Sequence, residues 1–306
     1  MAFSDIYHRQ VSLLMRTLPY VAEESCFALK GGTAINLFIR NMPRLSVDID
    51  LTYLPVAERD SSLCDIDSAL KRIGDRIRGI DNNIHVTESA PGSQNSINKL
   101  VVRTKDRIQI KIEVTPVLRG CVYEPVTMQV SEKVEDMFGF AEINVLSFAD
   151  LYAGKIMAAL DRQHPRDLFD VYQLLEKEGI TDDLRTALIV YLISHDHSPH
   201  SLLDPVLRDI SQDFEQNFVG MTIEDITLDT LLDTRKKLIA DVVGNMPENH
   251  KAFLRSFYSR NPDWTLLGID GVESLPAVRW RELNLGKAGE GTCESILRKL
   301  EKVIGS

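Results

Sequence analysis

The sequence feature that most constrains the fold is an apolar run carrying two aspartates, Val47-Asp48-Ile49-Asp50-Leu51. Alternate side chains of a strand share a face, so Asp48 and Asp50 are expected to project together while Val47, Ile49 and Leu51 point into a core. Two carboxylates held this close repel each other unless a cation lies between them. The run therefore predicts a strand over 47–53 with a site that suits Mg²⁺ at its end.

A pair of glycines precedes this strand and follows a first apolar run, 26–30, that is expected to be a strand. A turn without side chains that leads into a helix lets main-chain N–H groups approach a phosphate. Gly31, Gly32 and Thr33 are thus candidate nucleotide-binding residues, and a helix is expected over 33–40. Taken alone, Gly-Gly-Thr is more often a plain turn with an N-cap, and Asp-x-Asp is more often solvated surface.

Taken together, in the order strand, Gly-Gly, helix and Asp-x-Asp strand, the two patterns resemble the nucleotidyltransferase superfamily. Lys-Gly-Gly-Thr-Ala over 30–34, with Arg-Leu-Ser-Val-Asp-Ile-Asp-Leu over 44–51, is similar to its AbiEii/AbiGii toxin branch. The resemblance implies that Lys30 joins the glycines in binding nucleotide and that Ser46 orients a phosphate or the first aspartate. Two departures are Gly-Gly-Thr in place of the frequent Gly-Ser and the long interval to the aspartates.

An alternating hairpin follows, with strands expected over 100–104 and 107–114 and a turn at Lys105-Asp106. Its isoleucines share one face, and Glu113 lies on the polar face. In the superfamily that the chain resembles, the third carboxylate comes from a strand beside the Asp-x-Asp strand. That resemblance makes Glu113 a metal ligand or general base, whereas a lone glutamate on a polar strand face is as readily plain surface.

Charge restricts the partners of the chain. The net charge of −10 argues against a general nucleic-acid coat protein, because non-specific affinity for phosphate backbones comes from clustered Lys and Arg. Positive charge nevertheless gathers around the hairpin, at Lys99, Arg103, Lys105, Arg107, Lys111 and Arg119. These cations mark either a local RNA-binding surface or ordinary solvated charges.

A second block of motifs lies on two expected helices, the first opening at 147–150 and the second after Pro165. Lys155 lies on a helix rich in Ala, Met and Leu, where a charged residue needs a route to solvent or a partner. Ala-Gly-Lys155 followed by Arg-Asp167 is similar to the later motifs of AbiEii-like proteins. The resemblance assigns Lys155 to nucleotide phosphate and Asp167 to support of the site, leaving Asp170 for packing or capping.

Other features of the sequence carry less chemistry. Further helices are expected over 4–19, 60–79, 182–194, 203–218, 224–243, 248–259 and 291–304, strands over 84–89 and 142–146, and a loop over 91–96. The histidines of 195–200 are spaced like metal ligands, but a loop that ends a helix fits them better. The four cysteines are expected to be reduced and mostly buried. Trp264 and Trp280, in a stretch expected to be irregular, are expected to anchor a core or an interface.

The expected architecture is α/β: a small mixed sheet of nucleotidyltransferase type with flanking helices, followed by a helical domain. The catalytic domain is placed at 1–146, and the helical domain at 147–306 is expected to contribute Lys155 and Asp167 to the site. No apolar run approaches the ~18 residues of a membrane span and no signal-peptide pattern is present, so a cytoplasmic protein without membrane contacts is expected.

The resemblance implies a Mg²⁺-dependent enzyme that moves a nucleoside monophosphate from an NTP to an RNA acceptor, and the acceptor expected from it is the 3′ end of tRNA. Asp48, Asp50 and Glu113 would hold the metal. The enzyme would be the toxin of a type IV toxin–antitoxin or phage-defence pair with an AbiEi-like antitoxin. Two alternatives stay open: a small-molecule nucleotidyltransferase of the aminoglycoside-modifying sort, and an inactive nucleotide-binding module that acts through its helical half. The base preference and the oligomeric state are not given by the sequence.

Overall fold

The structure, a computed structural model, describes residues 5–90 and 96–305, and the chain divides into two compact units. Unit 1 comprises Met1–Ser147 with Gly220–Asp225, and unit 2 comprises Phe148–Val219 with Ile226–Ser306. The assignment of catalysis to 1–146 and of a supporting role to 147–306 stays a prediction.

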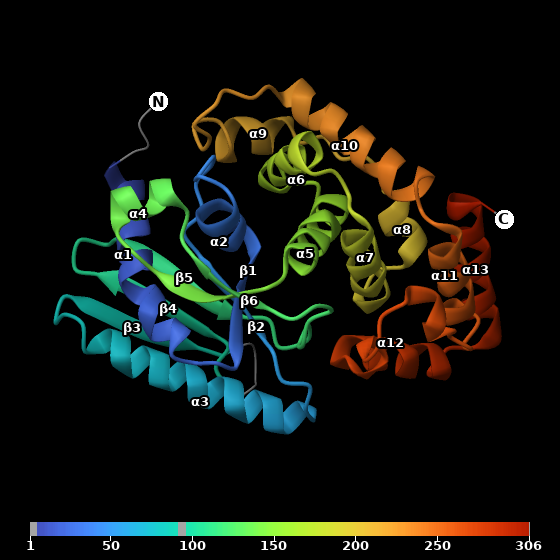
Figure 1. The fold of residues 1–306 in the computed structure, drawn as a ribbon, viewed down its shortest axis with the longest axis horizontal. Helices are drawn as coiled ribbons and strands as arrows, with labels where there is room; N and C mark the ends of the chain where they lie inside the picture. The colour runs from blue at the N-terminus through green and yellow to red at the C-terminus, as the bar shows by residue number, and fades with distance from the viewer. Residues whose placement is uncertain (1–4, 91–95, 306) are drawn as a thin grey trace. The chain divides into compact units, whose positions relative to one another are not determined.

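Unit 1 is built on a mixed sheet that has seven strands in the described part of the chain, in the order β3-β4-β5-β2-β1-β7-β6 (Figure 1). The strands are β1 Phe27–Lys30, β2 Ile49–Tyr53, β3 Ile84–Ser89, β4 Lys99–Thr104, β5 Gln109–Val114, β6 Val126–Gln129 and β7 Glu142–Val145. Strand β2 runs antiparallel to β1 and parallel to β5, which places the Asp-x-Asp strand in the middle of the sheet. The α/β fold class is confirmed.

Helices and apolar strand residues build the core of unit 1. The helices are α1 Asp5–Ala22, α2 Gly31–Ala34, the π-helix η1 Ile35–Ile39, α3 Arg59–Arg78 and α4 Glu132–Phe138. Helix α3 lies along β3 and β4 (Figure 1), and a side chain added at Gly74 would touch Val86 and Leu100. Leu100 belongs to the apolar face that continues through Ile112 and Leu51, all fully buried. Burying each such side chain contributes roughly 1.5–3 kcal/mol, so this face holds the sheet to its helices.

The start of the aspartate strand differs from the prediction. Strand β2 begins at Ile49 rather than Val47, Val47 is only half-buried, and Asp48 lies just before the strand. The reason is local, because the main-chain carbonyl of Asp48 accepts a hydrogen bond from Thr33 Oγ1 at 2.5 Å instead of joining the ladder. The helix predicted over 33–40 also begins earlier, at Gly31, and its second half is π-helical.

The hairpin of β4 and β5 has its turn at Lys105-Asp106, as predicted. Its second strand begins at Gln109 rather than Arg107, whose positive φ of 66° takes it out of the extended conformation. The isoleucine face is buried as predicted. Strand β6 and helix α4 were not predicted, and the first residue of the helix predicted over 4–19 and most of the loop predicted over 91–96 lie outside the described residues.

Unit 2 is helical in its described residues, and α5, α6, α7 and α10 form its central group (Figure 1). Its elements are α5 Phe148–Asp161, α6 Pro165–Lys177, α7 Asp182–Ser194, α8 Pro199–Leu203, α9 Ser211–Asn217, α10 Leu228–Gly244, α11 Glu248–Tyr258, η2 Trp264–Leu267, η3 Val272–Ser274, α12 Pro276–Lys287 and α13 Glu290–Ile304. The predicted helices over 182–194, 248–259 and 291–304 are confirmed to within a residue, and the one predicted over 224–243 begins later, at Leu228.

The single helix predicted over 203–218 is wrong. Helices α8 and α9 are separated by a non-helical segment, because Pro205 follows the C-cap of α8 and cannot continue the helix, and the buried side chain of Gln163 binds the main chain of this segment. Gln163 Nε2 donates to Val206 O at 2.9 Å, and its Oε1 accepts the Arg208 N–H at 3.0 Å. Arg235 donates both to Gln163 Oε1 and to Arg208 O. Val206 itself is 89% exposed, so the apolar pattern around it did not mark a helix face.

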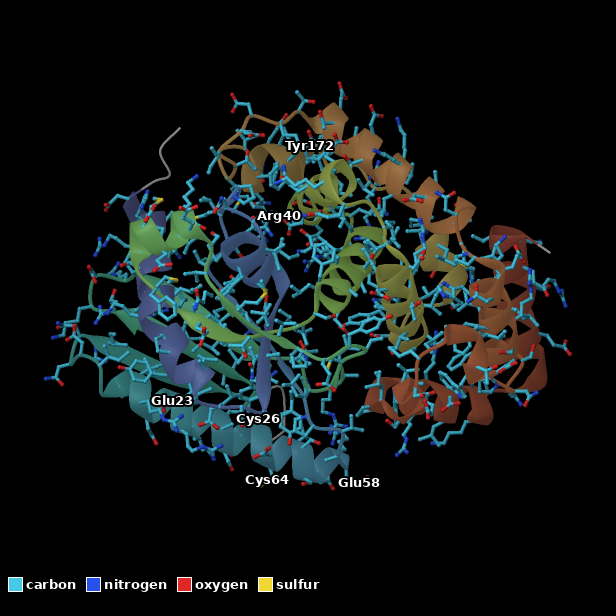
Figure 2. All side chains as sticks on the ribbon, viewed as in Figure 1. Glu23, Cys26, Arg40, Glu58, Cys64 and Tyr172 are labelled. Atoms are coloured by element: carbon cyan, nitrogen blue, oxygen red, sulfur yellow. The ribbon has the colours of Figure 1, made fainter. Side chains whose placement is uncertain are left out.

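The tryptophans and cysteines were predicted only in part. Trp264 packs 5.2 Å from Phe253 between ring centroids, which confirms a core role, but Trp280 lies on α12, is 58% exposed and anchors no core. All four cysteines are free thiols as predicted. Only Cys293 is buried, whereas Cys26, directly before β1, is half-buried and Cys64, on α3, is exposed (Figure 2). No helix in the described residues combines the length and apolar character needed to cross a membrane.

Candidate active site

The turn between β1 and α2 is shaped by a close approach of Asp50. Gly31 has a positive φ of 74°, and a Cβ at this position would lie 2.7 Å from Asp50 Oδ2. L-residues with side chains avoid this backbone region, and a Cβ cannot sit at that distance from an oxygen. Gly31 therefore allows the Asp50 carboxylate to lie directly against the main chain of the turn.

Gly32 is required by a second approach, from the loop that leads to β2. A Cβ there would lie 2.7 Å from Arg44 Nη2 and 2.8 Å from Ser46 Oγ. Arg44 is 3% exposed, and its Nη1 also donates to Leu45 O at 2.7 Å. Sequence reasoning missed Arg44, although its place two residues before Ser46 in the family-like run was a usable signal.

Hydroxyl groups fasten the loop to the turn. Thr33 Oγ1 donates to the Asp48 carbonyl at 2.5 Å and lies 3.0 Å from Ser46 Oγ, so the single Thr33 proton leaves Ser46 as the donor between the two hydroxyls. Tyr7 was also missed. Its hydroxyl accepts the Ser46 N–H at 2.5 Å and donates to Ser46 O at 3.3 Å.

Burial raises the pKa of the Tyr7 hydroxyl well above its ordinary value, despite the hydrogen bond from Ser46 and the charge of Arg44. Tyr7 consequently stays a neutral donor and acceptor. The loop is tied on its other side as well, where Leu45 N–H donates to Met221 O and Ile223 N–H donates to Pro43 O, both at 2.9 Å. The position of Asp48 is thus fixed from three directions.

Asp50 and Glu113 are direct neighbours across two parallel strands. In the register of the sheet, Asp50 is opposite Glu113 on one side and opposite Lys30 on the other. Lys30 is half-buried and its ammonium donates to Thr115 Oγ1 at 2.9 Å. Burial lowers the pKa of Lys30, and the carboxylates of Asp50 and Glu113 oppose that shift. Two acidic groups therefore meet in the middle of the sheet with a lysine beside them.

This donor set fits one kind of metal site. Within residues 5–90 and 96–305, no three or more His, Cys, Asp or Glu side chains are arranged as a ready group of ligands, and the histidines of 195–200 form no such group. Mg²⁺ is commonly held by one or two carboxylates and completed by water and substrate phosphates. The pairing of Asp50 with Glu113, with Asp48 two residues earlier, fits such an open site rather than a closed cage.

The second block of predicted site residues forms a buried ion cluster inside unit 2. Lys155, on α5, is 7% exposed, and its ammonium lies 2.8 Å from Asp167 Oδ1 and 3.0 Å from Asp170 Oδ2, both on α6. Burial by itself would raise the pKa of Asp167, but Lys155 and Arg162 hold it well below its usual range. The lysine is not a surface residue, and its ion pairs do not favour Asp167 over Asp170.

The structure thus collects the predicted residues into two groups, one in each unit. The group in unit 1 contains Lys30, Gly31, Gly32, Thr33, Ser46, Asp48, Asp50 and Glu113. The group in unit 2 contains Lys155 and Asp167. Whether these residues bind nucleotide or metal stays a prediction.

A mixed sheet whose central strand follows a Gly-Gly turn and carries Asp50, with Asp48 directly before that strand, is typical of nucleotidyltransferases. The chain belongs to the AbiEii family, because the model described as "Nucleotidyl transferase AbiEii toxin, Type IV TA system" matches residues 12–280. The fold is similar to that of MenT4, a nucleotidyltransferase toxin from Mycobacterium tuberculosis H37Rv, with a TM-score of 0.59 and 14% identity over 98% of this chain and 92% of that one. No curated protein matches the chain.

Family membership confirms the expected enzyme class. The chain is a nucleotidyltransferase and the toxin of a type IV toxin–antitoxin system. A nucleoside triphosphate substrate and an antitoxin partner follow from that membership, and nucleotidyltransferases generally use divalent metal ions.

Proposed function

We propose that this toxin uses Mg²⁺ to transfer a nucleoside monophosphate from an NTP to RNA, at the 3′ end of tRNA. The observation that carries the proposal is the placement of Asp50 against the Gly31 main chain and beside Glu113. Acidic groups and a phosphate-accessible turn are thereby brought to one point of the sheet, as in-line attack of a hydroxyl on an α-phosphate requires.

Asp48 and Asp50 would hold the metal, with Glu113 as a third ligand or as the general base for the acceptor hydroxyl. When bound, Mg²⁺ supplies positive charge that neutralises the phosphate oxygens. The first N–H groups of α2, including those of Gly32 and Thr33, would bind triphosphate oxygens, because the first N–H groups of a helix have no partner within it.

Three further residues of the chain would assist binding. Ser46 is oriented by Thr33 and Tyr7 toward a phosphate or toward Asp48, and Lys30 adds positive charge beside the carboxylates. Lys155 would add a charge to the triphosphate, with Asp167 keeping it in place.

The proposal of an RNA acceptor is supported by the exposed end of the β4–β5 hairpin. Lys105, Arg107 and Arg103 are exposed there, whereas Arg119, predicted as part of the same cluster, is buried and does not belong to the surface. A 3′ end is single-stranded and accessible, so it can reach an active site without duplex melting. The proposal also includes an AbiEi-like antitoxin as the partner and a role in phage defence. The toxin would act in the cytoplasm, where tRNA and NTPs are present together.

The experiment is to incubate the purified protein with each labelled NTP, Mg²⁺ and total cell RNA, and to follow label on RNA together with pyrophosphate release. Asp48→Asn and Asp50→Asn should lower the rate by about 100-fold or more, because each removes a charge that holds the metal but keeps the size of the side chain.

The matched control is Asp60→Asn, the same change at an exposed aspartate of α3, which should leave the rate unchanged. Full activity of Asp48→Asn would overturn the metal assignment. Label appearing only on small molecules would support an aminoglycoside-type enzyme, and magnesium-independent nucleotide binding without pyrophosphate release would support an inactive binding module.

A further inference from the structure

Four charged side chains form a continuous row across four neighbouring strands of unit 1. The register places Lys99 of β4 opposite Glu113 of β5, Glu113 opposite Asp50 of β2, and Asp50 opposite Lys30 of β1. The order of charges is therefore positive, negative, negative, positive. Neighbouring cross-strand side chains interact, and like charges directly opposite each other are unfavourable. The two lysines offset the repulsion between the two carboxylates.

The two lysines differ in how firmly they are held. Lys30 is half-buried and its ammonium is anchored to Thr115 Oγ1. Lys99 lies at the outer end of the row, where its Nζ is 3.2 Å from Glu113 Oε2 and both side chains are partly exposed to solvent. A partly exposed lysine with a single ion pair is weakly held and can move away, since ion pairs in contact with water are worth little.

We infer that Lys99 is a built-in counter-ion of the acidic site, which occupies Glu113 in the metal-free protein and releases it when metal binds. This inference rests on the proposed function, in which the carboxylates of the row hold a divalent ion. A positive charge resting on a carboxylate competes with a metal for that carboxylate and also repels the metal directly. Lys99 thereby weakens metal binding to the free protein, so that occupancy depends on the charge brought by the nucleoside triphosphate.

The test is a titration of the nucleotide-free protein with Mn²⁺, with bound metal measured by electron paramagnetic resonance rather than by activity. Lys99→Met should bind Mn²⁺ about 3- to 10-fold more tightly than the natural protein, because it removes a competing charge. Lys99→Arg keeps the charge and should bind as the natural protein does. In a Glu113→Gln background, the Lys99→Met change should have little further effect, since its partner is already neutral.

Lys71→Met is the matched control, since it removes the same charge from an exposed ion pair with Asp67 on helix α3. It should leave the Mn²⁺ affinity unchanged. The inference is overturned if Asp50→Asn weakens Mn²⁺ binding but Lys99→Met does not strengthen it. In that case Lys99 only links β4 to β5 through its ion pair with Glu113. If the Asp50→Asn variant binds Mn²⁺ as tightly as the natural protein does, Asp50 does not hold the metal, and the proposed function is wrong on this point instead.

Discussion

Gly31 shows at the scale of one residue how closely the candidate site is built. Two independent features exclude a side chain at this position: the positive φ of Gly31, and the short distance that an added Cβ would have to Asp50 Oδ2. Gly31→Ala should lower the free energy of unfolding by more than about 1 kcal/mol, because alanine neither favours this conformation nor fits beside the carboxylate. The variant should also lose nucleotide transfer, since Asp50 must move. Chemical denaturation and the labelling assay measure the two effects.

Gly286→Ala is the control for that change. Gly286 lies in helix α12 with no atom within 4 Å of an added Cβ, so alanine should be neutral or should stabilise by up to about 1 kcal/mol. A Gly31→Ala variant with natural stability and activity would show that the close approach to Asp50 is unimportant.

The site residues that were predicted lie in a local sequence pattern, whereas those that were missed act through contacts between residues distant in sequence. Gly31, Gly32 and the aspartates stand in a local pattern whose spacing carries the chemistry. Tyr7 acts on Ser46 from a helix 39 positions away, and no periodicity connects the two. Lys99 was noticed only as one of several hairpin cations, because its pairing with Glu113 depends on strand register.

At the scale of elements, helices α5 and α6 are joined through buried charges. Replacing Lys155 by Met should destabilise unit 2 by about 3–5 kcal/mol, because Asp167 and Asp170 lose the cation they share in the interior. Because the pKa of Asp167 is depressed in the folded chain, its contribution to stability is present above the ordinary aspartate value of 3.8 and is lost as the pH falls below it. In Lys155→Met this loss should be smaller, because only Arg162 then holds the pKa of Asp167 down. Urea unfolding between pH 7 and pH 2 measures both effects.

The matched change is Lys236→Met, which removes an exposed lysine paired with Asp233 on α10 and should cost less than about 1 kcal/mol. If Lys155→Met unfolds like this control while losing affinity for nucleotide, the lysine serves the triphosphate and not the fold.

Helices and strands were predictable where the spacing of apolar side chains follows one period, helical or alternating, without interruption. The alternation over β5 and the helical period of α7 and α11 gave their type and approximate ends. Helices α8 and α9 were merged in the prediction although Pro205 marks the break, and the contacts of Gln163 and Arg235 that hold the segment between them come from far away in sequence. Strand β2 was extended too far because Thr33, not the sheet, binds the carbonyl of Asp48.

At the scale of the whole molecule, recognisable motifs occupied only about half of the sequence, whereas the family match extends over residues 12–280. Beyond α6 the helical unit consists of ordinary amphipathic helices, so the relation of that part to the family could not be inferred from residue chemistry. Net charge sets the other large-scale constraint, since a chain of −10 repels RNA except where cations gather locally.

The last prediction concerns that local charge. Reversing Lys105 and Arg107 together to glutamate should lower RNA labelling about tenfold at low salt while nucleotide binding stays unchanged, because both side chains are exposed at the hairpin turn. The dependence of labelling on salt should also become shallower, by about one unit of logarithmic slope for each phosphate that the variant no longer neutralises. Labelling of tRNA at increasing salt concentrations measures both effects.

Reversal of Lys236 and Lys237, two adjacent exposed lysines of α10, makes the same change in net charge elsewhere. If general repulsion limits RNA binding, both double variants should label RNA equally poorly, because each lowers the net charge by four. If the hairpin binds the RNA, only Lys105 and Arg107 should matter, and the difference should vanish at high salt as their attraction to phosphate is screened. Equal labelling by the hairpin variant and the natural protein at low salt would place the acceptor-binding surface elsewhere.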